Sequence, residues 1–324
     1  MTRIYLLQTS LFFLLFFASC KKSDTEGGGS SAKGVLKGIV YSPNGEVPLA
    51  SVTLETFVNG NKVSTASDKD GTFALELPAG NYNMTMYSGA GAHFSTQKNF
   101  RVEAGKTTDV PASQSRLSFT GKIGYVKGLY DEIESLVHEM GIETTELSLS
   151  DMTDYNIVKQ YDLLLLNCMS GYIDFETNKI LDRYLKEGHS IYASDMELQA
   201  LSAQDWGFIP ASLLSYNTEG KEGIIEGTVL FEPFKKALGK SKMEIEFDLP
   251  MYVQVTNVAA NDQRFKVLVS HPQKGPLALN IQWGPARTSA QGIPYGGNII
   301  YTTFHDAILS NDVKAVLRQM ILQL

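Results

Sequence analysis

Cysteine is scarce in this sequence. Only Cys20 and Cys168 occur among 324 residues. Two cysteines are too few for a fold held by several disulfides, or for a zinc or iron–sulfur site built from several thiolates. Basic residues are also outnumbered, because 28 lysines and arginines face 35 aspartates and glutamates, for a net charge of −7. A chain without a basic excess lacks the surface that neutralises phosphates, so we expect no nucleic-acid partner.

The sequence also lacks the marks of a disordered, membrane-spanning or nucleotide-binding protein. Its hydrophobic fraction of 43% is too high for a disordered chain and too low for a protein with many spans. No glycine-rich phosphate loop occurs, and the spacing of His93, His138, His189 and His271 predicts no metal site. We therefore expect no cofactor. At about 100–200 residues per domain, the length predicts two folded domains.

The one long apolar run lies at the N-terminus. Residues 4–19 are uncharged and mostly apolar, and the run ends in the small pair Ala18-Ser19 before Cys20. Sixteen residues are short for a membrane span of about 20. The pattern resembles a bacterial lipoprotein signal peptide, which is cleaved before a cysteine that is then acylated. The resemblance implies removal of residues 1–19 and lipidation of Cys20; the alternative is an ordinary secretory signal with an incidental cysteine.

A short polar segment follows the cysteine. Residues 20–33 are rich in Gly, Ser and charge, and cannot bury enough apolar area to become ordered, so they predict a flexible tether. The acidic residues after the two lysines resemble the export tag of surface lipoproteins in Bacteroidetes-like bacteria. These resemblances imply a cell-envelope protein, attached by lipid to the outer membrane on its periplasmic or surface face.

Residues 34–114 alternate between apolar and polar positions in short runs. Asn44-Gly45, Asp70-Gly71 and Ala79-Gly80 separate these runs, as turns do in antiparallel sheets. The segment therefore predicts an all-β antiparallel sandwich.

The order of these signals is more specific than the fold class. The stretches that carry it are Gly38-Ile39-Val40, Pro48-Leu49-Ala50-Ser51-Val52, Asp70-Gly71 with Phe73, Leu77-Pro78-Ala79-Gly80-Asn81-Tyr82 and Ala104-Gly105-Lys106. Together they resemble the carboxypeptidase regulatory-like family. The resemblance implies a transthyretin-like sandwich, a type grouped with carbohydrate-binding folds, and a non-catalytic accessory role. We interpret Phe73 and Tyr82 as core residues, and Asp68 and Asp70 as turn residues rather than calcium ligands.

Residues 116–324 change to alternating strands and helices. Strands are predicted at 117–126, 142–149, 161–167 and 190–194, with helices between them and after Ser310. Asp174 is the predicted cap of one helix, which ends at Gly188. Alternation of this kind predicts a doubly wound parallel sheet. Residues of about 223–295 are rich in strand patterns and predict a β-rich insertion before the last strand and helix.

This second half resembles the class I glutamine-amidotransferase-like superfamily. The resemblance is carried by YDLLLLNC at 161–168, by SIYASD at 190–195 after a helix and glycine, and by GGNIIYTTFHD at 296–306. It implies a flavodoxin-like core. It also implies a nucleophilic cysteine on a tight glycine-flanked turn after the fourth strand, and a histidine after the last.

Polar residues follow three predicted strands of this core. They are Asn167 and Cys168, Ser194 and Asp195, and His305 and Asp306. Because open parallel sheets bind ligands beyond the carboxyl ends of their strands, we expect these side chains to share one edge. His305 matches the implied histidine. At the implied nucleophile the chain has Ser194 instead of cysteine and lacks both glycines, so we expect no nucleophile-bearing turn there.

We therefore predict a non-catalytic binding protein. Asn167, Asp195 and His305 are the candidate binding residues at the strand ends, and the sandwich face is the other candidate surface. The expected ligand is a glycan, a peptide or an envelope protein, and a purely assembly-related role also stays open. The alternative is a hydrolase or amidotransferase-like enzyme in which Ser194 or Cys168 is the nucleophile and His305 the base, oriented by Asp195 or Asp306.

Overall fold

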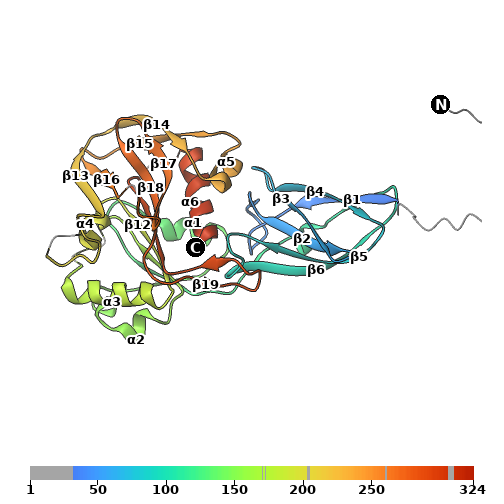
Figure 1. Cartoon of the computed structure of the whole chain (residues 1–324), viewed down its shortest axis with the longest axis horizontal. Coiled ribbons are helices and arrows are strands. Elements are labelled where there is room, and N and C mark those ends of the chain that lie inside the picture. Colours follow the sequence, from blue (N-terminus) through green and yellow to red (C-terminus); the bar gives the residue numbers. More distant parts are fainter. Residues whose placement is uncertain (1–31, 170, 172, 203–204, 260, 306–309) are drawn as a thin grey trace, which may run out of the picture. The chain divides into compact units, whose positions relative to one another are not determined.

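A computed structural model of the chain describes residues 32–169, 171, 173–202, 205–259, 261–305 and 310–324. The predicted signal peptide, the predicted lipidation site Cys20, most of the predicted tether and Asp306 lie outside the described residues. Ala32–Leu324 form one compact unit. Among the described residues, no helix is both long enough and apolar enough to cross a membrane. The molecule is mostly β-sheet (Figure 1).

The first part of the described chain is a β-sandwich, as predicted. One sheet has the order β4-β1-β7, made of β4(Thr72–Pro78), β1(Lys33–Ile39) and β7(Thr107–Asp109). The other has the order β3-β2-β5-β6-β8, made of β3(Asn61–Ala66), β2(Thr53–Val58), β5(Gly80–Tyr87), β6(Phe94–Val102) and β8(Ser118–Phe119). All neighbours pair antiparallel except β1 and β7.

The sandwich core follows the period of two along its strands. In β4 every second residue is buried, so Phe73 packs inside as predicted. Tyr82 is half-buried and donates its hydroxyl to the carbonyl of Pro78 at 2.8 Å. The Asp68 carboxylate accepts from the backbone N–H groups of Asp70 and Thr72, each at 3.0 Å. These bonds confirm that the two aspartates lie in a turn, as predicted.

The second part contains a nine-stranded sheet with the order β10-β9-β11-β12-β21-β18-β17-β14-β15. Its strands are β10(Thr144–Glu146), β9(Ile123–Val126), β11(Leu163–Leu166), β12(Ser190–Ser194), β21(Asn298–Thr302), β18(Gly275–Gln282), β17(Phe265–His271), β14(Gly223–Val229) and β15(Lys242–Phe247). The pairs from β10 to β21 are parallel, and those from β21 to β15 are antiparallel. Four strands of the β-rich segment thus extend the parallel sheet.

Two short ribbons complete the strands. They are β13(Leu214–Gly220) with β16(Tyr252–Val258), and β19(Arg287–Thr288) with β20(Pro294–Tyr295). The helices are α1(Ile133–Glu139), α2(Tyr155–Val158), α3(Phe175–Lys186), α4(Glu197–Ser202), α5(Glu232–Leu238) and α6(Asn311–Gln323), and 3-10 turns span Ala112–Gln114 and Asp151–Thr153. The predicted caps are confirmed, since Asp174 accepts from Thr177 N and Ser310 from Val313 N.

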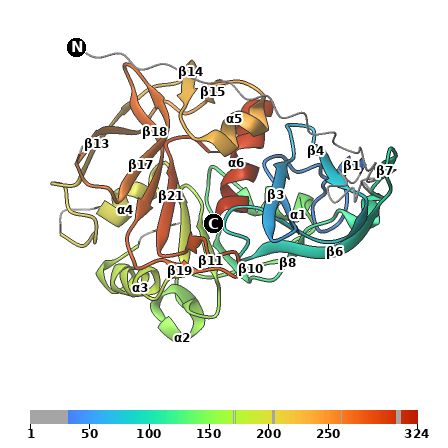
Figure 2. The same cartoon turned by 45° about the vertical axis from the view of Figure 1, so that its right-hand side comes forward.

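Helices cover both faces of the parallel strands. Successive residues of β12 belong to different buried clusters: Tyr192 faces the cluster with α1 and α6, whereas Ile191 and Ala193 face the one with α3 and α4. Figures 1 and 2 show these helix pairs on opposite sides of the sheet. Burial on both faces explains why β11 and β12 are almost wholly apolar.

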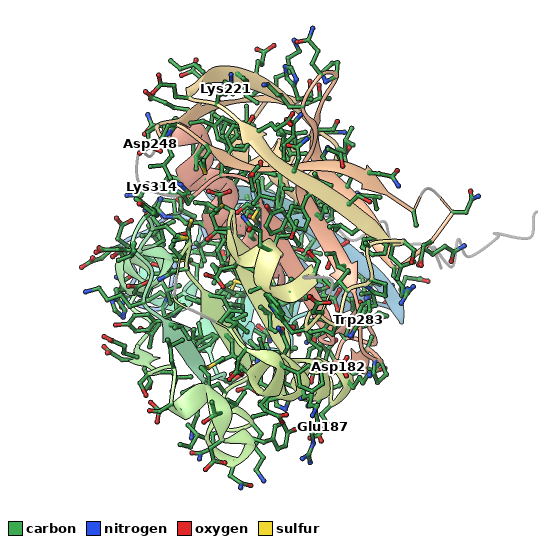
Figure 3. The ribbon with its side chains drawn as sticks, turned by 90° about the vertical axis from the view of Figure 1, so that its left-hand side faces the viewer. Asp182, Glu187, Lys221, Asp248, Trp283 and Lys314 are labelled. Carbon is green, nitrogen blue, oxygen red and sulfur yellow. The ribbon has the colours of Figure 1, made fainter. Side chains whose placement is uncertain are left out.

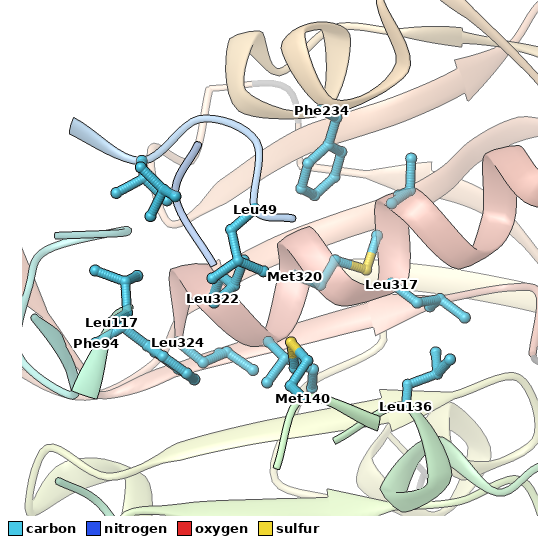
Figure 4. Close-up of a cluster of buried hydrophobic side chains, with 14 of the residues drawn as sticks. Leu49, Phe94, Leu117, Leu136, Met140, Phe234, Leu317, Met320, Leu322 and Leu324 are labelled. Atoms are coloured by element: carbon cyan, nitrogen blue, oxygen red, sulfur yellow. The ribbon is translucent and has the colours of Figure 1, made fainter. Parts of the chain in front are cut away.

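The sandwich and the second half share one hydrophobic cluster, shown in Figure 4. Leu49 and Leu117 enter it from the sandwich, while Met140 follows α1 and Met320 belongs to α6. Hydrogen bonds border the cluster: Asn44 Nδ2 donates to the carbonyl of Glu139 at 2.9 Å, and Ser51 Oγ donates to that of Pro233, also at 2.9 Å. The two halves are therefore packed through a common core.

Candidate functional site

Three neighbouring parallel strands deliver three chemically active side chains to one place. Cys168 follows β11, Asp195 follows β12 and His305 follows β21. Cys168 Sγ donates to Asp195 Oδ2 at 3.6 Å, and His305 Nε2 lies 3.9 Å from the same oxygen. We call these three residues the strand-end cluster. The structure thus brings three of the predicted site residues together, as expected for the carboxyl edge of a parallel sheet.

Asp195 occupies a strained turn between β12 and α4. Its φ is +43°, in the left-handed region that residues other than glycine rarely adopt. A strained turn thus follows this strand without flanking glycines, but it carries Asp195, one residue after Ser194, and not a nucleophile. Asp195 N donates to the carbonyl of Thr302 at 2.7 Å, and Tyr301 Oη donates to the carbonyl of Asp195 at 3.1 Å. These bonds hold a conformation that costs about 1–3 kcal/mol.

The cluster is strongly shielded from water. Burial raises the pKa of Asp195 to about 7, although its hydrogen bond from Val253 N opposes the shift. Burial also raises the pKa of the Cys168 thiol, with the Asp195 carboxylate adding to the effect. The pKa of His305 is lowered, because the buried imidazolium loses its hydration. The thiol is therefore not activated as a nucleophile in this arrangement.

The other predicted site residues have different partners. Ser194 Oγ donates to Asp131 Oδ2 at 2.5 Å, and Asp131 Oδ1 accepts from Cys168 N at 2.6 Å. Asn167 Nδ2 donates to Glu134 Oε2 at 2.7 Å. Ser194 and Asn167 are thus engaged by acidic side chains from the segment 131–134. Ser194 donates its hydroxyl proton to a carboxylate, so the serine form of the hydrolase alternative lacks the serine–histidine hydrogen bond that it needs.

The β13–β16 ribbon closes the strand ends. Val253 N donates to Asp195 Oδ1 at 2.6 Å. Beside His305 lies a cavity of about 10 Å³, which Tyr252 and Phe304 also line. A cavity of this size has room for about one water molecule and for no substrate. Sequence reasoning missed Tyr252 and Val253, because strand periodicity does not tell which side chains a distant ribbon places over the sheet edge.

Trp283 and Phe208 pack away from this cluster. Their rings lie 5.4 Å apart, and Trp283 Nε1 donates to Asp182 Oδ1 on α3 at 2.7 Å. Figure 3 shows Trp283 and Asp182 side by side. These residues therefore link the end of β18 to α3, and the closure of the strand ends comes from the ribbon.

A second candidate surface lies on the outer face of the larger sandwich sheet. A groove of about 670 Å³ runs across β3, β2, β5, β6 and β8. The register places Glu55 opposite Thr85, and Thr85 opposite Gln97, so these three polar side chains form a row. Phe57 lies on the same face as Glu55 and is 60% exposed. We call this the sandwich groove.

Charge in the sandwich groove is largely neutralised. Lys62 Nζ lies 3.0 Å from Glu55 Oε2, and Tyr87 Oη donates to the same oxygen at 2.9 Å. Gln97 Nε2 lies 3.4 Å from Thr85 Oγ1. The groove therefore offers hydroxyls and amides beside one exposed aromatic ring. The sequence analysis did not identify Phe57 as a candidate. The strand pattern does indicate its position, because residues two apart in a strand share a face, which places Phe57 beside Glu55 and opposite buried Leu54.

Comparison with known proteins identifies the sandwich. Residues 35–113 match the carboxypeptidase regulatory-like domain. None of the curated proteins compared matches the chain. A candidate GMP synthase protein from Thermoplasma acidophilum is 12% identical over 63% of this chain and 94% of its own, with a TM-score of 0.43. A candidate ThuA-like protein from Bacteroides uniformis is 11% identical over 62% and 89%, also with a TM-score of 0.43.

A glutamine amidotransferase from Thermotoga maritima is also similar. It is 10% identical over 63% of this chain and 88% of its own, with a TM-score of 0.34. None of these TM-scores is high enough to assign the fold of the second half, which is defined by its own strand order.

Proposed function

We propose that this chain is a lipid-anchored cell-envelope protein that binds a glycan in the sandwich groove. The observation that carries the proposal is Phe57, a large apolar ring left exposed beside a row of hydroxyl and amide side chains. The apolar face of a sugar ring stacks on an aromatic side chain, and its hydroxyls need neutral donors and acceptors around it. The matched domain supports a binding role rather than a catalytic one.

The volume and chemistry of the sandwich groove suit a small oligosaccharide. Ligand sites span about 300–1,000 Å³, and the groove falls inside that range at about 670 Å³. The Glu55–Lys62 pair leaves no strong net charge to select an ionic ligand. In the described part of the chain, the strand ends hold a cavity of about 10 Å³ beside His305, which leaves no room there for the substrate that the hydrolase alternative requires.

We further propose that the second half is a flavodoxin-like, amidotransferase-like domain that carries no substrate site of its own. In chain order its parallel strands run 2-1-3-4-5, which is the flavodoxin-like arrangement. Asn167, Asp195 and His305 then serve the architecture of the strand ends rather than ligand recognition.

Membrane attachment is proposed from the sequence of the first twenty residues. Replacing Cys20 by Ala should release the protein from the membrane fraction and abolish incorporation of labelled fatty acid. Replacing Cys168 by Ala should leave both unchanged, because only a cysteine at the cleavage site is acylated. Unchanged fractionation of the Cys20→Ala protein would refute the anchor.

Glycan binding is tested by exchange of the exposed ring. Binding of an oligosaccharide and muropeptide panel to the full chain is measured first, followed by titration of the best ligand. Phe57→Ala should weaken it about tenfold, equivalent to about 1.4 kcal/mol. Phe175 on α3 is also exposed, so Phe175→Ala is the matched control and should leave affinity unchanged. The proposal fails if no glycan binds, if Phe57→Ala binds as well as the parent, or if an envelope protein occupies the groove instead.

A further inference from the structure

The strand-end cluster contains the three ligand types that zinc prefers. Cysteine sulfur, histidine nitrogen and carboxylate oxygen occur together at Cys168, His305 and Asp195. Their ligand atoms all lie within 4.8 Å of one another. Each ligand follows a different strand, and the three strands are neighbours in the order β11-β12-β21. The arrangement of the strands in the sheet therefore brings the three side chains together.

The distances fit a tetrahedral zinc ion. With Zn–S near 2.3 Å and Zn–N and Zn–O near 2.1 Å, the edges of the tetrahedron are about 3.4–3.6 Å. The structure has 3.6 Å between Cys168 Sγ and Asp195 Oδ2, and 3.9 Å between His305 Nε2 and that oxygen. These two edges are within a few tenths of an ångström of the tetrahedral lengths, and the third, between Cys168 Sγ and a His305 ring nitrogen, is at most 4.8 Å.

Neighbouring groups hold the ligands in place. Asp195 Oδ1 accepts from Val253 N, which leaves Oδ2 directed at the thiol and imidazole. The backbone N–H of Cys168 donates to Asp131 Oδ1 at 2.6 Å. Such outer hydrogen bonds orient the ligands of metal sites and are part of their affinity.

A second, independent observation concerns Tyr252. Its side chain is 1% exposed, and among the residues that the structure describes its hydroxyl has no hydrogen-bond partner. Tyr252 lines the cavity of about 10 Å³ beside His305. Leaving a buried hydroxyl without a partner costs about 1–3 kcal/mol. One water in that cavity, which His305 also lines, would give the hydroxyl a partner. Where a protein supplies three zinc ligands, a water is the usual fourth.

We propose that Cys168, Asp195 and His305 bind one zinc ion, with a water as fourth ligand. The ion joins the ends of β11, β12 and β21 beneath the β13–β16 ribbon. Because the cavity beside His305 in the described part of the chain has room for about one water, we assign the ion to stabilising the strand ends rather than to binding a substrate. The proposal is independent of the sandwich groove, and each can fail without the other.

Cobalt is the probe, because a cobalt–thiolate bond absorbs in the near ultraviolet. The full chain carrying Cys20→Ala has Cys168 as its only thiol. After treatment with a chelator it should bind one equivalent of Co²⁺ with a charge-transfer band, and Zn²⁺ should displace the cobalt and raise the urea midpoint. Absence of the band from natively folded protein would overturn the proposal, whatever the variants do.

Variants assign the ligands. Cys168→Ser should abolish the band, and His305→Gln should weaken cobalt binding at least tenfold. The matched control is His138→Gln, since His138 is exposed on α1 and should not affect binding. If Cys168→Ser or His305→Gln folds and retains full affinity, the assignment is wrong. If a variant does not fold, the spectrum of the parent protein still decides.

Discussion

Replacing Gly89 by alanine tests whether the sandwich packs against α6 as the structure shows. Gly89 lies between β5 and β6 with φ +56°, and a Cβ there would be 2.7 Å from the carbonyl oxygen of Leu322 and 3.0 Å from Gln323 Cα. Both atoms belong to the backbone of the last turn of α6, which cannot move aside as a flexible side chain does. We therefore expect Gly89→Ala to push this turn of the sandwich away from α6.

The magnitude follows from two separable costs. An alanine at positive φ costs about 1–2 kcal/mol, offset by about 0.4–1 kcal/mol because the unfolded chain loses freedom. Gly60 has φ +80°, and a Cβ at that position would meet nothing within 4 Å, so Gly60→Ala bears this cost alone. We expect it to lose about 1 kcal/mol. The backbone clash at Gly89 adds the cost of overpacking, about 1–3 kcal/mol. Gly89→Ala should therefore lose about 2–4 kcal/mol in total.

Urea unfolding followed by far-ultraviolet circular dichroism measures both variants. The free energies of unfolding are comparable if the three proteins share one m value. Gly89→Ala should have the lower midpoint. If the two variants lose the same stability within about 0.5 kcal/mol, a typical limit for independent sites, then α6 does not lie against Gly89 in solution and the reasoning is refuted.

Three further predictions use the same unfolding assay. Burial lowers the pKa of His189 below its usual 6.5, so the unfolded state binds the proton first and the free energy of unfolding falls as the pH drops below about 6.5. His189→Gln should reduce that fall between pH 7 and 5, and an unchanged fall would contradict the prediction. Ser310→Ala removes the cap on Val313 N and should cost about 1 kcal/mol, with Ser310→Asp restoring it. Leu317→Ala in α6 should cost about 2–5 kcal/mol, and a loss below 1 kcal/mol would contradict its burial.

Local signals made much of the fold predictable. Asp174 and Ser310 cap helices through hydrogen bonds to residues three positions later, so the sequence contains both partners of each bond. The predicted strand at 190–194 agrees with β12, because a short apolar run between a glycine and a turn is typical of a buried strand. The helix predicted between the strands at 117–126 and 142–149 begins only at Ile133, since the loop before it places Asp131 in the core.

Strand pairing was harder to predict than strand position. The alternating runs of 223–295 indicate strands, but an alternating pattern does not indicate which strand pairs with which. In the structure β18 pairs antiparallel with β21, so the β-rich segment continues the parallel sheet. The edge strand β3 has no fully buried residue, and its pattern therefore carried too little hydrophobic contrast to be recognised.

The strand-end cluster shows which part of a site a sequence specifies. Parallel strands end at one edge, so the convergence of Cys168, Asp195 and His305 could be anticipated from the strands alone. The conformation at Asp195 could not, because missing glycines argue against a sharp turn, whereas hydrogen bonds with Thr302 and Val253 impose one. Those partners are distant in sequence and obey no periodicity. A positive φ without glycine is therefore evidence of tertiary constraint, and here it directs a carboxylate between a thiol and an imidazole.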